Sequence, residues 1–294
     1  MTRAGPVPRP ASGAVPLSVL VDFDGTVSET DVTDALLAGY ATDPAWRARD
    51  RDYAEGRAGS RTLLAWDVTI LAPEPARLLR TALAQQLDPT FVPFVAQVRA
   101  LGGTVEVVSD GFGFYVAPLL ERLGVGDLPI ATAEMHLDEV PMRIAFPYGH
   151  PACFVCGTCK RQRVLAHREA GRFVILVGDG ESDRYAAWHA DLTFAKGGLA
   201  RLCEEAGWPY RPWQRFADVA VALADGLGEG RIPGTLDALE RLRSTQPSRG
   251  YVCGPEAWGP GREAPGPDRQ ARGGGAATAG PGEGGTLAAD SLLR

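Results

Sequence analysis

Acidic side chains stand close together near the start of the chain, where an apolar run ends. The stretch VLVDFDGTVSET covers residues 19 to 30 and places Asp22 and Asp24 one residue apart, directly before Gly25 and Thr26. Two carboxylates this close repel each other unless a cation or a shared proton offsets their charge. The pattern costs stability and therefore indicates a functional use, for which cation binding and proton transfer are the chemistry that fits.

Other residues that could do chemistry follow apolar runs in the same way. Ser109 ends the run GTVEVVS, Lys160 begins a helical segment, and Asp179 and Asp183 lie in GDGESD, just after FVILV. The carboxylates could serve as nucleophile, proton donor and cation ligands, while the hydroxyl and the ammonium could bind phosphate oxygens. This combination of side chains favours phosphoryl-transfer chemistry.

The elements that must position these residues can be read from short apolar runs. Runs rich in β-branched residues and bounded by Gly, Pro or Asp predict buried parallel strands at 17–23, 103–109, 128–133, 173–178 and 192–195. Segments with helical periodicity lie between them. The alternation predicts an α/β fold with an open, Rossmann-like parallel sheet. The polar residues above are then expected at the carboxyl edge of that sheet, where such folds bind ligands.

One insertion interrupts this alternation directly after the first strand. Residues 31–87 contain helical pieces but no convincing strand, which predicts a small helical cap over the carboxyl ends of the strands. The catalytic core would then comprise residues 16–30 and 88–243. Residues 1–15 and the Pro/Gly-rich residues 244–294 cannot bury enough apolar surface to fold, so both ends are predicted to be disordered.

Composition narrows the classes of partner. The chain has 294 residues, 45% of them hydrophobic, and a formal net charge of -6 with a pI near 5.3. No long run of either charge sign indicates a nucleic-acid or anionic-membrane surface. No apolar stretch reaches the roughly 18 to 20 residues of a membrane span, and no signal peptide is evident, so we expect a cytoplasmic protein. Its expected partner is a small metabolite, and assembly as a homodimer is left open.

Taken in order, these motifs resemble those of a known superfamily. DFDGT, the serine of VVSDGF, Lys160 and GDGESD match the four motifs of the haloacid dehalogenase superfamily of phosphotransferases, and the helical insert is similar to its first cap type. The resemblance spans about residues 18 to 243 and implies a magnesium-dependent phosphomonoester hydrolase. It implies that Asp22 attacks phosphorus to form an aspartyl phosphate. Asp24 would protonate the leaving oxygen and then take a proton from the hydrolytic water.

The resemblance also implies how Mg²⁺ and phosphate are held. The metal would be bound by the carboxylates of Asp22 and Asp179 and the backbone carbonyl of Asp24, with Asp183 supporting them. The phosphoryl oxygens would be held by side chains and backbone N–H groups. These phosphate-binding residues are Ser109, Lys160, Gly25 and Thr26.

A cysteine-rich run allows two interpretations. HPACFVCGTCK spaces Cys153, Cys156 and Cys159 by C-x2-C-x2-C, and His150 could supply a fourth zinc ligand. Structural zinc sites more often use two separated pairs, and an intracellular protein can simply bury reduced thiols. Plain thiols are therefore the favoured interpretation.

The cysteine run and the segment LTFAKGGLARLCEEAGWPYRPWQRFADV also resemble the 2-hydroxy-3-keto-5-methylthiopentenyl-1-phosphate phosphatases of methionine salvage. Phosphoserine phosphatases are the closest alternative, but they carry a glutamate where this chain has Asp31. They also carry Gly-Gly where it has Asp110 and Gly111. These three residues are candidates for substrate binding, with a helix N-cap as the alternative for Asp31. An apolar cap containing Trp46 and Trp66 favours a thioether tail over a zwitterion.

Two further classes of protein remain open. A catalytically silent phosphate-binding regulatory module would be free to lose a site residue, and a dehalogenase would not need the second acid at Asp24. All of the expected side chains are present in the chain. An active phosphatase is therefore the favoured hypothesis.

Overall fold

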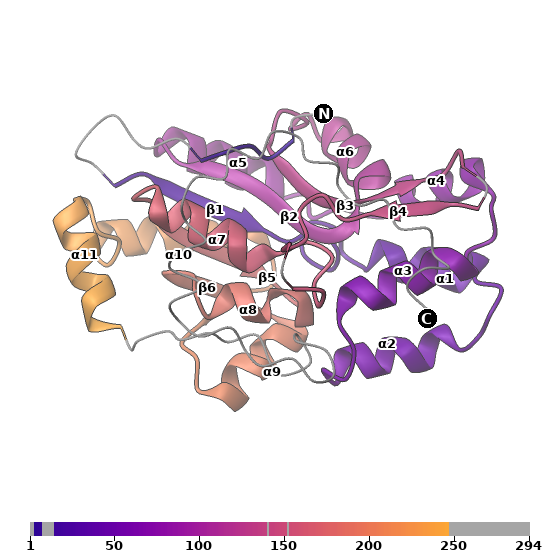
Figure 1. Ribbon diagram of the computed structural model, residues 1–294. Helices are drawn as coiled ribbons and strands as arrows, with labels where there is room; N and C mark the ends of the chain where they lie inside the picture. Colours follow the sequence, from indigo (N-terminus) through magenta and orange to yellow (C-terminus); the bar gives the residue numbers. More distant parts are fainter. Residues whose placement is uncertain (1–2, 8–14, 140, 152, 247–294) are drawn as a thin grey trace.

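Within the residues that the structure describes, seven strands form one sheet in the order β4-β3-β2-β1-β5-β6-β7 (Figure 1). The computed structural model describes residues 3–7, 15–139, 141–151 and 153–246. All neighbouring strands are parallel except β3 and β4, which are antiparallel. The predicted α/β class is confirmed. The strands are β1 (Leu17–Val21), β2 (Thr104–Phe112), β3 (Ile130–His136), β4 (Arg143–Ala145), β5 (Phe173–Gly178), β6 (Leu192–Ala195) and β7 (Arg211–Pro212).

The sheet differs from the predicted one at its edges and in β2. The edge strands β4 and β7 have three and two residues, which is too short for a periodic apolar pattern. Strand β2 continues to Phe112, beyond its predicted end, and its pairing with β3 shifts register between Val108 and Phe112. Such an irregularity bends a strand and re-aims its side chains, here next to Ser109.

Helices cover both faces of the sheet. In β1, Leu17, Val19 and Val21 pack into the core on one face, whereas Leu20 packs on the other, because successive side chains of a strand point to opposite faces. The first core includes residues of α5 (Phe91–Ala100), α6 (Gly113–Arg122), α10 (Phe216–Gly228) and α11 (Leu236–Thr245). The second includes residues of α7 (Lys160–Glu169), α8 (Arg184–Ala187) and α9 (Gly197–Ala206), and a 3-10 turn, η1 (Glu181–Asp183), precedes α8.

Five helices separate β1 from β2, of which α5 belongs to the core and the first four form the insert. Asp31 caps the first of them by accepting a hydrogen bond from the backbone N–H of Asp34 at 2.9 Å, and Pro75 begins the fourth, where it requires no N–H partner. Ser28 and Leu87 pair where the chain leaves and re-enters the core. The helices of the insert are α1 (Val32–Tyr40), α2 (Trp46–Ala54), α3 (Ser60–Ile70) and α4 (Pro75–Leu83). The insert is helical as expected, and its boundaries as a separate cap domain stay a prediction.

Several predictions concern segments that the structure does not describe or describes only in part. Residues 1–2, 8–14 and 247–294, which make up most of the two predicted disordered ends, lie outside the described residues. The described helices are all too short or too polar to cross a membrane.

Candidate active site

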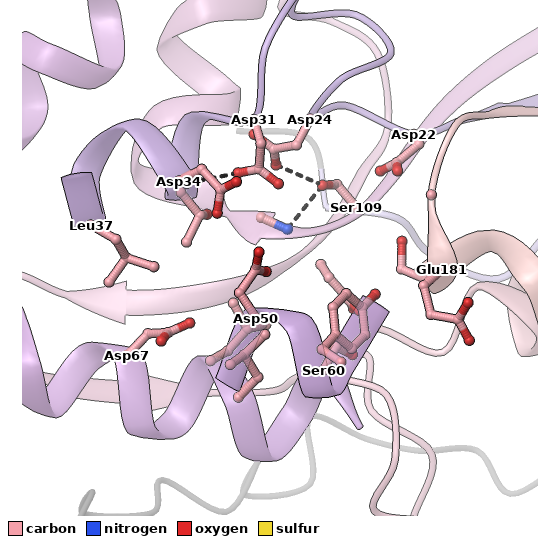
Figure 2. A pocket seen from close by; sticks show the side chains of 18 of the residues that line it. Asp22, Asp24, Asp31, Asp34, Leu37, Asp50, Ser60, Asp67, Ser109 and Glu181 are labelled. Atoms are coloured by element: carbon pink, nitrogen blue, oxygen red, sulfur yellow. Dashed lines mark hydrogen bonds between the residues drawn. The ribbon is translucent and has the colours of Figure 1, made fainter. Parts of the chain in front are cut away.

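A cavity of about 130 Å³ opens between the carboxyl ends of the strands and the helical insert (Figure 2). Asp22 and Asp24 follow β1, Ser109 lies in β2, and Asp179 follows β5, and all four line this cavity. The parallel sheet brings these residues together although they are far apart in the sequence. The space suits a small leaving group, since an apolar protein cavity of about 150 Å³ can hold benzene.

Lys160 pairs with Asp22, which lines this cavity. Its Nζ is 2.8 Å from Oδ1 of Asp22, and it donates to Oδ1 of Asp183 at 2.8 Å and to Oγ of Ser182 at 2.7 Å. The side chain is 1% exposed. Burial alone would lower the pKa of Lys160, but the charges of Asp183 and Asp22 outweigh it and raise that pKa. Lys160 thus stays charged and forms an ion pair with Asp22 beside the cavity.

Three carboxylates, called the acidic trio below, lie where a metal ion could bind. Oxygens of Asp22, Asp179 and Asp183 lie within 4.8 Å of one another, the one such group of acidic, histidine or cysteine ligands in the described part of the chain. Burial and the charge of Asp22 raise the pKa of Asp179 to about 6. A hard divalent cation would remove this repulsion, and oxygen ligands are those that Mg²⁺ prefers. The donor set therefore fits Mg²⁺.

The side chain of Asp24 is held apart from the acidic trio. Its Oδ1 accepts the backbone N–H of Val32 at 2.9 Å, and its Oδ2 accepts the hydroxyls of Tyr115 at 2.8 Å and Ser109 at 3.4 Å. Burial and the charge of Asp22 raise the pKa of Asp24 to about 7. A carboxyl group with such a pKa can both give and take a proton near neutral pH.

Tyr115 was not predicted as a site residue. It is buried, reaches Asp24 from the first turn of α6, and also contacts the hydroxyl of Thr33 at 3.2 Å. In the sequence it reads as part of an apolar helix face, so periodicity gave no sign of its hydroxyl contact.

Two glycines are required by close approach of the backbone to carboxylates. Gly25 has φ +69°, and a Cβ there would lie 2.3 Å from Oδ2 of Asp179. A Cβ on Gly111 would lie 2.2 Å from both Oδ2 of Asp24 and the hydroxyl oxygen of Tyr115. Glycine is thus the one residue type that leaves room for these groups.

The phosphate-binding roles of Gly25 and Thr26 stay a prediction. The N–H of Gly25 donates to the carbonyl of Thr30 at 3.3 Å, and the N–H of Thr26 donates to the carbonyl of Phe23 at 3.2 Å. The hydroxyl of Thr26 donates to Oδ1 of Asp179 at 2.9 Å. In this structure the Gly25–Thr26 turn therefore orients the carboxylate of Asp179, a member of the acidic trio.

Asp110 connects the end of β2 to the cysteine-rich loop. Its Oδ1 accepts the backbone N–H of Thr158 at 2.5 Å, two residues before Lys160. Burial raises the pKa of Asp110, and the charge of Lys160 partly offsets this. From the helical insert, Ser60 accepts the N–H of Gly157 at 3.2 Å. Asp110, which also lines the cavity, thus holds the loop that delivers Lys160.

Cys153, Cys156 and Cys159 of that loop form no disulfide among the described residues. Cys153 and Cys159 are buried, and burial raises the pKa of Cys159. These cysteines and His150 do not form a ligand group of the kind that the acidic trio forms, as far as the chain is described. All four residues nevertheless line one small cavity, so zinc ligation and plain thiols both stay predictions.

The helical insert contributes residues that the sequence did not single out. Asp34, Asp50 and Asp67 line the cavity, together with an apolar side made of Leu37, Leu63 and Leu64. Asp31 caps α1 and also lines the cavity, and its role in substrate binding stays a prediction. Trp46 and Trp66 instead pack into the hydrophobic core and are absent from the cavity lining, so the expectation that they shape the substrate site is not supported.

A family model for haloacid dehalogenase-like hydrolases matches residues 19–187, more than half of the chain. The chain belongs to this family. The match includes the end of the first strand and the two aspartates after it, the helical insert, Lys160 and the acidic turn after β5. All residues of the acidic trio thus lie within the haloacid dehalogenase-like region.

Curated relatives and solved structures agree with the family. The chain is 30% identical over 216 residues to the 2-hydroxy-3-keto-5-methylthiopentenyl-1-phosphate phosphatase of Geobacillus kaustophilus, covering 70% of this chain and 95% of the relative. It is 27% identical over 207 residues to the protein of the same name from Exiguobacterium sibiricum, covering 69% and 94%. A solved phosphoserine phosphatase holding a phospho-aspartyl intermediate analogue superposes with a TM-score of 0.54 at 16% identity, covering 71% of this chain and 99% of that one. This last likeness supports the fold.

Proposed function

We propose that this haloacid dehalogenase-like hydrolase cleaves small phosphomonoesters through an aspartyl phosphate formed on Asp22. The chain is a phosphoric monoester hydrolase. The observation that carries the mechanism is the placement of Asp22, which is paired with Lys160 at 2.8 Å and belongs to the acidic trio. Asp24 lines the same cavity with its raised pKa.

The residues divide the reaction into two steps. In the first, an Asp22 oxygen attacks phosphorus, the bond from phosphorus to the leaving oxygen breaks, and Asp24 gives its proton to that oxygen. In the second, water attacks the phosphorus of the aspartyl phosphate, Asp24 takes a proton from this water, and Asp22 is released. Tyr115 and the N–H of Val32 keep the Asp24 carboxyl in place for both steps.

Mg²⁺ would be held by Asp22, Asp179 and Asp183 and would neutralise charge on the transferring phosphoryl group. The carbonyl of Asp24 remains the further ligand expected from the family resemblance. Lys160 and the hydroxyl of Ser109 are the proposed contacts to the phosphoryl oxygens. Ser109 is well placed for this role because it lines the cavity and its hydroxyl lies 3.4 Å from Oδ2 of Asp24.

For the substrate we propose 2-hydroxy-3-keto-5-methylthiopentenyl-1-phosphate, an intermediate of methionine salvage. Support comes from the names of the relatives at 27 and 30% identity. The side chains of Leu37, Leu63 and Leu64 offer an apolar surface for a methylthio tail. The alternative, phosphoserine, would bring a carboxylate into a cavity whose described lining contains no basic side chain, so it is the weaker candidate.

The experiment that tests this function is hydrolysis of p-nitrophenyl phosphate by the purified protein. We expect turnover with Mg²⁺, loss of turnover in excess chelator, and loss of turnover in Asp22→Asn. The variant must keep the circular dichroism spectrum of the parent protein. Undiminished turnover by folded Asp22→Asn would exclude the mechanism, and inactivity of the parent protein on all phosphomonoesters would favour a silent phosphate-binding module.

A substrate panel tests the finer proposal. We expect the enol phosphate to show a higher kcat/KM than phosphoserine. The reverse order would exclude the methionine-salvage substrate while leaving the chemistry at Asp22 intact.

A further inference from the structure

Three carboxylates on the helical insert face the cavity but take no part in the proposed phosphoryl transfer. They are Asp34 on α1, Asp50 on α2 and Asp67 on α3, and Figure 2 shows them around the side of the cavity away from Asp22. We refer to them as the cap carboxylates. Their positions are those of groups that meet the leaving alcohol, since phosphate is held at the strand ends.

Asp67 is the member of this set that most needs a partner. The residue is 1% exposed, and its Oδ1 has no hydrogen-bond partner among the described residues. Figure 2 shows its carboxyl group directed into the cavity. A buried carboxylate oxygen without a hydrogen-bond partner costs stability, and a ligand that brings a donor would remove this cost.

The surroundings of the cap carboxylates supply little positive charge. None of the described residues that line the cavity is basic. Two cations lie nearby: the guanidinium of Arg49 stacks on the ring of Trp66, 4.1 Å from the centroid, and the charge of Arg51 acts on Asp50. Burial and the charges of Asp50 and Asp34 outweigh Arg49 and raise the pKa of Asp67 to about 8. The cavity is therefore poised to accept a positive charge.

The cap carboxylates are not spaced to hold one metal ion with all three side chains. Within the described chain, the only three acidic ligands whose oxygens come within 4.8 Å of one another are Asp22, Asp179 and Asp183. The cap carboxylates repel one another through space but do not converge on one point. A larger cation with several N–H donors suits such an arrangement better than a metal ion does.

We propose that Asp34, Asp50 and Asp67 bind a primary ammonium group on the leaving alcohol, so that the enzyme also hydrolyses small amino-alcohol phosphates. The inference rests on the proposed function, because it uses the same phosphoryl site. An amino alcohol is favoured over an amino acid because the described cavity lining offers no basic group to a substrate carboxylate. The small cavity, about 130 Å³, limits the alcohol to a few heavy atoms.

Two esters of nearly equal shape test this proposal. 2-Aminoethyl phosphate and 2-hydroxyethyl phosphate differ mainly in the charge of the terminal group. We expect kcat/KM to be at least tenfold higher for the amine, and we expect Asp67→Asn to reduce this preference at least tenfold. Asp127→Asn is the matched control, since it removes an exposed carboxylate that pairs with Arg99, and it should leave the preference unchanged.

A binding measurement decides the inference independently of turnover. Calorimetric titration with ethanolamine should show binding that releases a proton at pH 7, because the ammonium lowers the pKa of Asp67, and ethylene glycol should not bind. Should Asp67→Asn fail to fold, Asp50→Asn provides the same comparison. Equal turnover of the two esters, or absence of ethanolamine binding, would overturn the inference. Inactivity on both esters and on p-nitrophenyl phosphate, with ethanolamine bound, would overturn the proposed function and support the ammonium site.

Discussion

At the scale of single residues, the site separates two carboxylates that the sequence places one residue apart. Asp22 is paired with Lys160, whereas Asp24 accepts hydrogen bonds from Tyr115 and Val32. Burial and the negative charge of Asp22 raise the pKa of Asp24 to about 7. These different environments fit the two tasks proposed for the neighbouring acids, nucleophile for Asp22 and proton carrier for Asp24.

The first prediction concerns the proton carrier. Asp24→Asn keeps the shape of the side chain but cannot give or take the proton, so kcat for an ester with a poor leaving group should fall roughly 10²- to 10⁴-fold. Steady-state kinetics with an alkyl phosphate measure this. A smaller fall with p-nitrophenyl phosphate is expected, because its leaving group needs little protonation. Parent-like kcat on the alkyl ester would remove Asp24 from the mechanism.

The second prediction concerns Asp67 and the stability of the fold. Its folded-state pKa of about 8 lies above the ordinary 3.8, so between these values the folded protein binds more protons than the unfolded chain. The stability that protonated Asp67 contributes at low pH is therefore lost as the pH rises toward 8. Asp67→Asn removes this loss and should raise the free energy of unfolding at pH 8 by roughly 1–3 kcal/mol.

Urea unfolding of the parent protein and Asp67→Asn at pH 5 and pH 8 measures how this stability difference depends on pH. The stability gained by Asp67→Asn over the parent protein should be larger at pH 8. A gain of equal size at both pH values, or a less stable variant, would show that the Asp67 carboxyl is not the destabilising group inferred from its burial.

At the scale of elements, loops and helix ends do the positioning. The cysteine-rich loop joins three parts of the molecule, because Asp110 of β2 binds its Thr158 N–H and Ser60 of α3 binds its Gly157 N–H. Lys160 follows at once as the first residue of α7. The loop that closes against the insert thus also fixes the lysine beside Asp22.

Helix α11 gives a third prediction. Arg243 on this helix donates to both carboxylate oxygens of Asp191, at 2.9 and 2.6 Å, and the Asp191 side chain is fully buried. Arg243→Met would leave that charge without its main partner and should cost about 3 kcal/mol of unfolding free energy. Arg241→Met, an exposed position on the same helix, is the matched control.

Chemical denaturation measures both variants. An equal loss in the two would show that α11 is stabilised by its apolar face rather than by the pair with Asp191. Turnover of p-nitrophenyl phosphate by folded Arg243→Met should match that of the parent protein.

Much of the fold could be predicted because its signals are local. The apolar runs at β1, β5 and β6 and the polar residues that follow strands are visible in the sequence, and the parallel sheet then brings those residues together. Strand β4 and the continuation of β2 could not be predicted. One is too short, and the other passes through Asp110 and Gly111, which strands disfavour.

The cap side of the cavity was harder to predict. Trp46 and Trp66 drew attention by their size, yet they pack into the core, and Leu37, Leu63 and Leu64 line the cavity instead. The cap carboxylates come from three different helices, so their convergence depends on how the helices pack. The periodicity of one helix does not predict which helices pack beside it.

At the scale of the whole molecule, charge is distributed about the cavity in two layers. The acidic trio lies at the sheet edge beneath it, and the cap carboxylates lie on the insert opposite. A metal ion at the sheet edge and a phosphoryl group between the layers would alternate in charge with the carboxylates. In the proposed complex, the negative ester would then lie between Mg²⁺ and the ammonium of the leaving alcohol.

The fourth prediction concerns magnesium and overall stability. Because Asp22, Asp179 and Asp183 repel one another, Mg²⁺ bound to the folded protein should raise the melting temperature by a few degrees at saturating concentration. Differential scanning fluorimetry with Mg²⁺, and with NaCl at equal ionic strength as control, measures this. Asp179→Asn should reduce the magnesium-dependent rise, and an equal rise with NaCl would show that the trio does not bind the metal specifically.

The most direct test of the account is to trap the proposed intermediate. Asp24→Asn, which should slow hydrolysis of the aspartyl phosphate, is mixed with p-nitrophenyl phosphate and Mg²⁺ and then reduced with borohydride, which converts an acyl phosphate to an alcohol. Peptide mass spectrometry should find homoserine at position 22, dependent on substrate and absent when Asp22→Asn is treated in the same way. Released phosphate without any homoserine at position 22, or homoserine at another aspartate, would contradict the claim that Asp22 is the nucleophile.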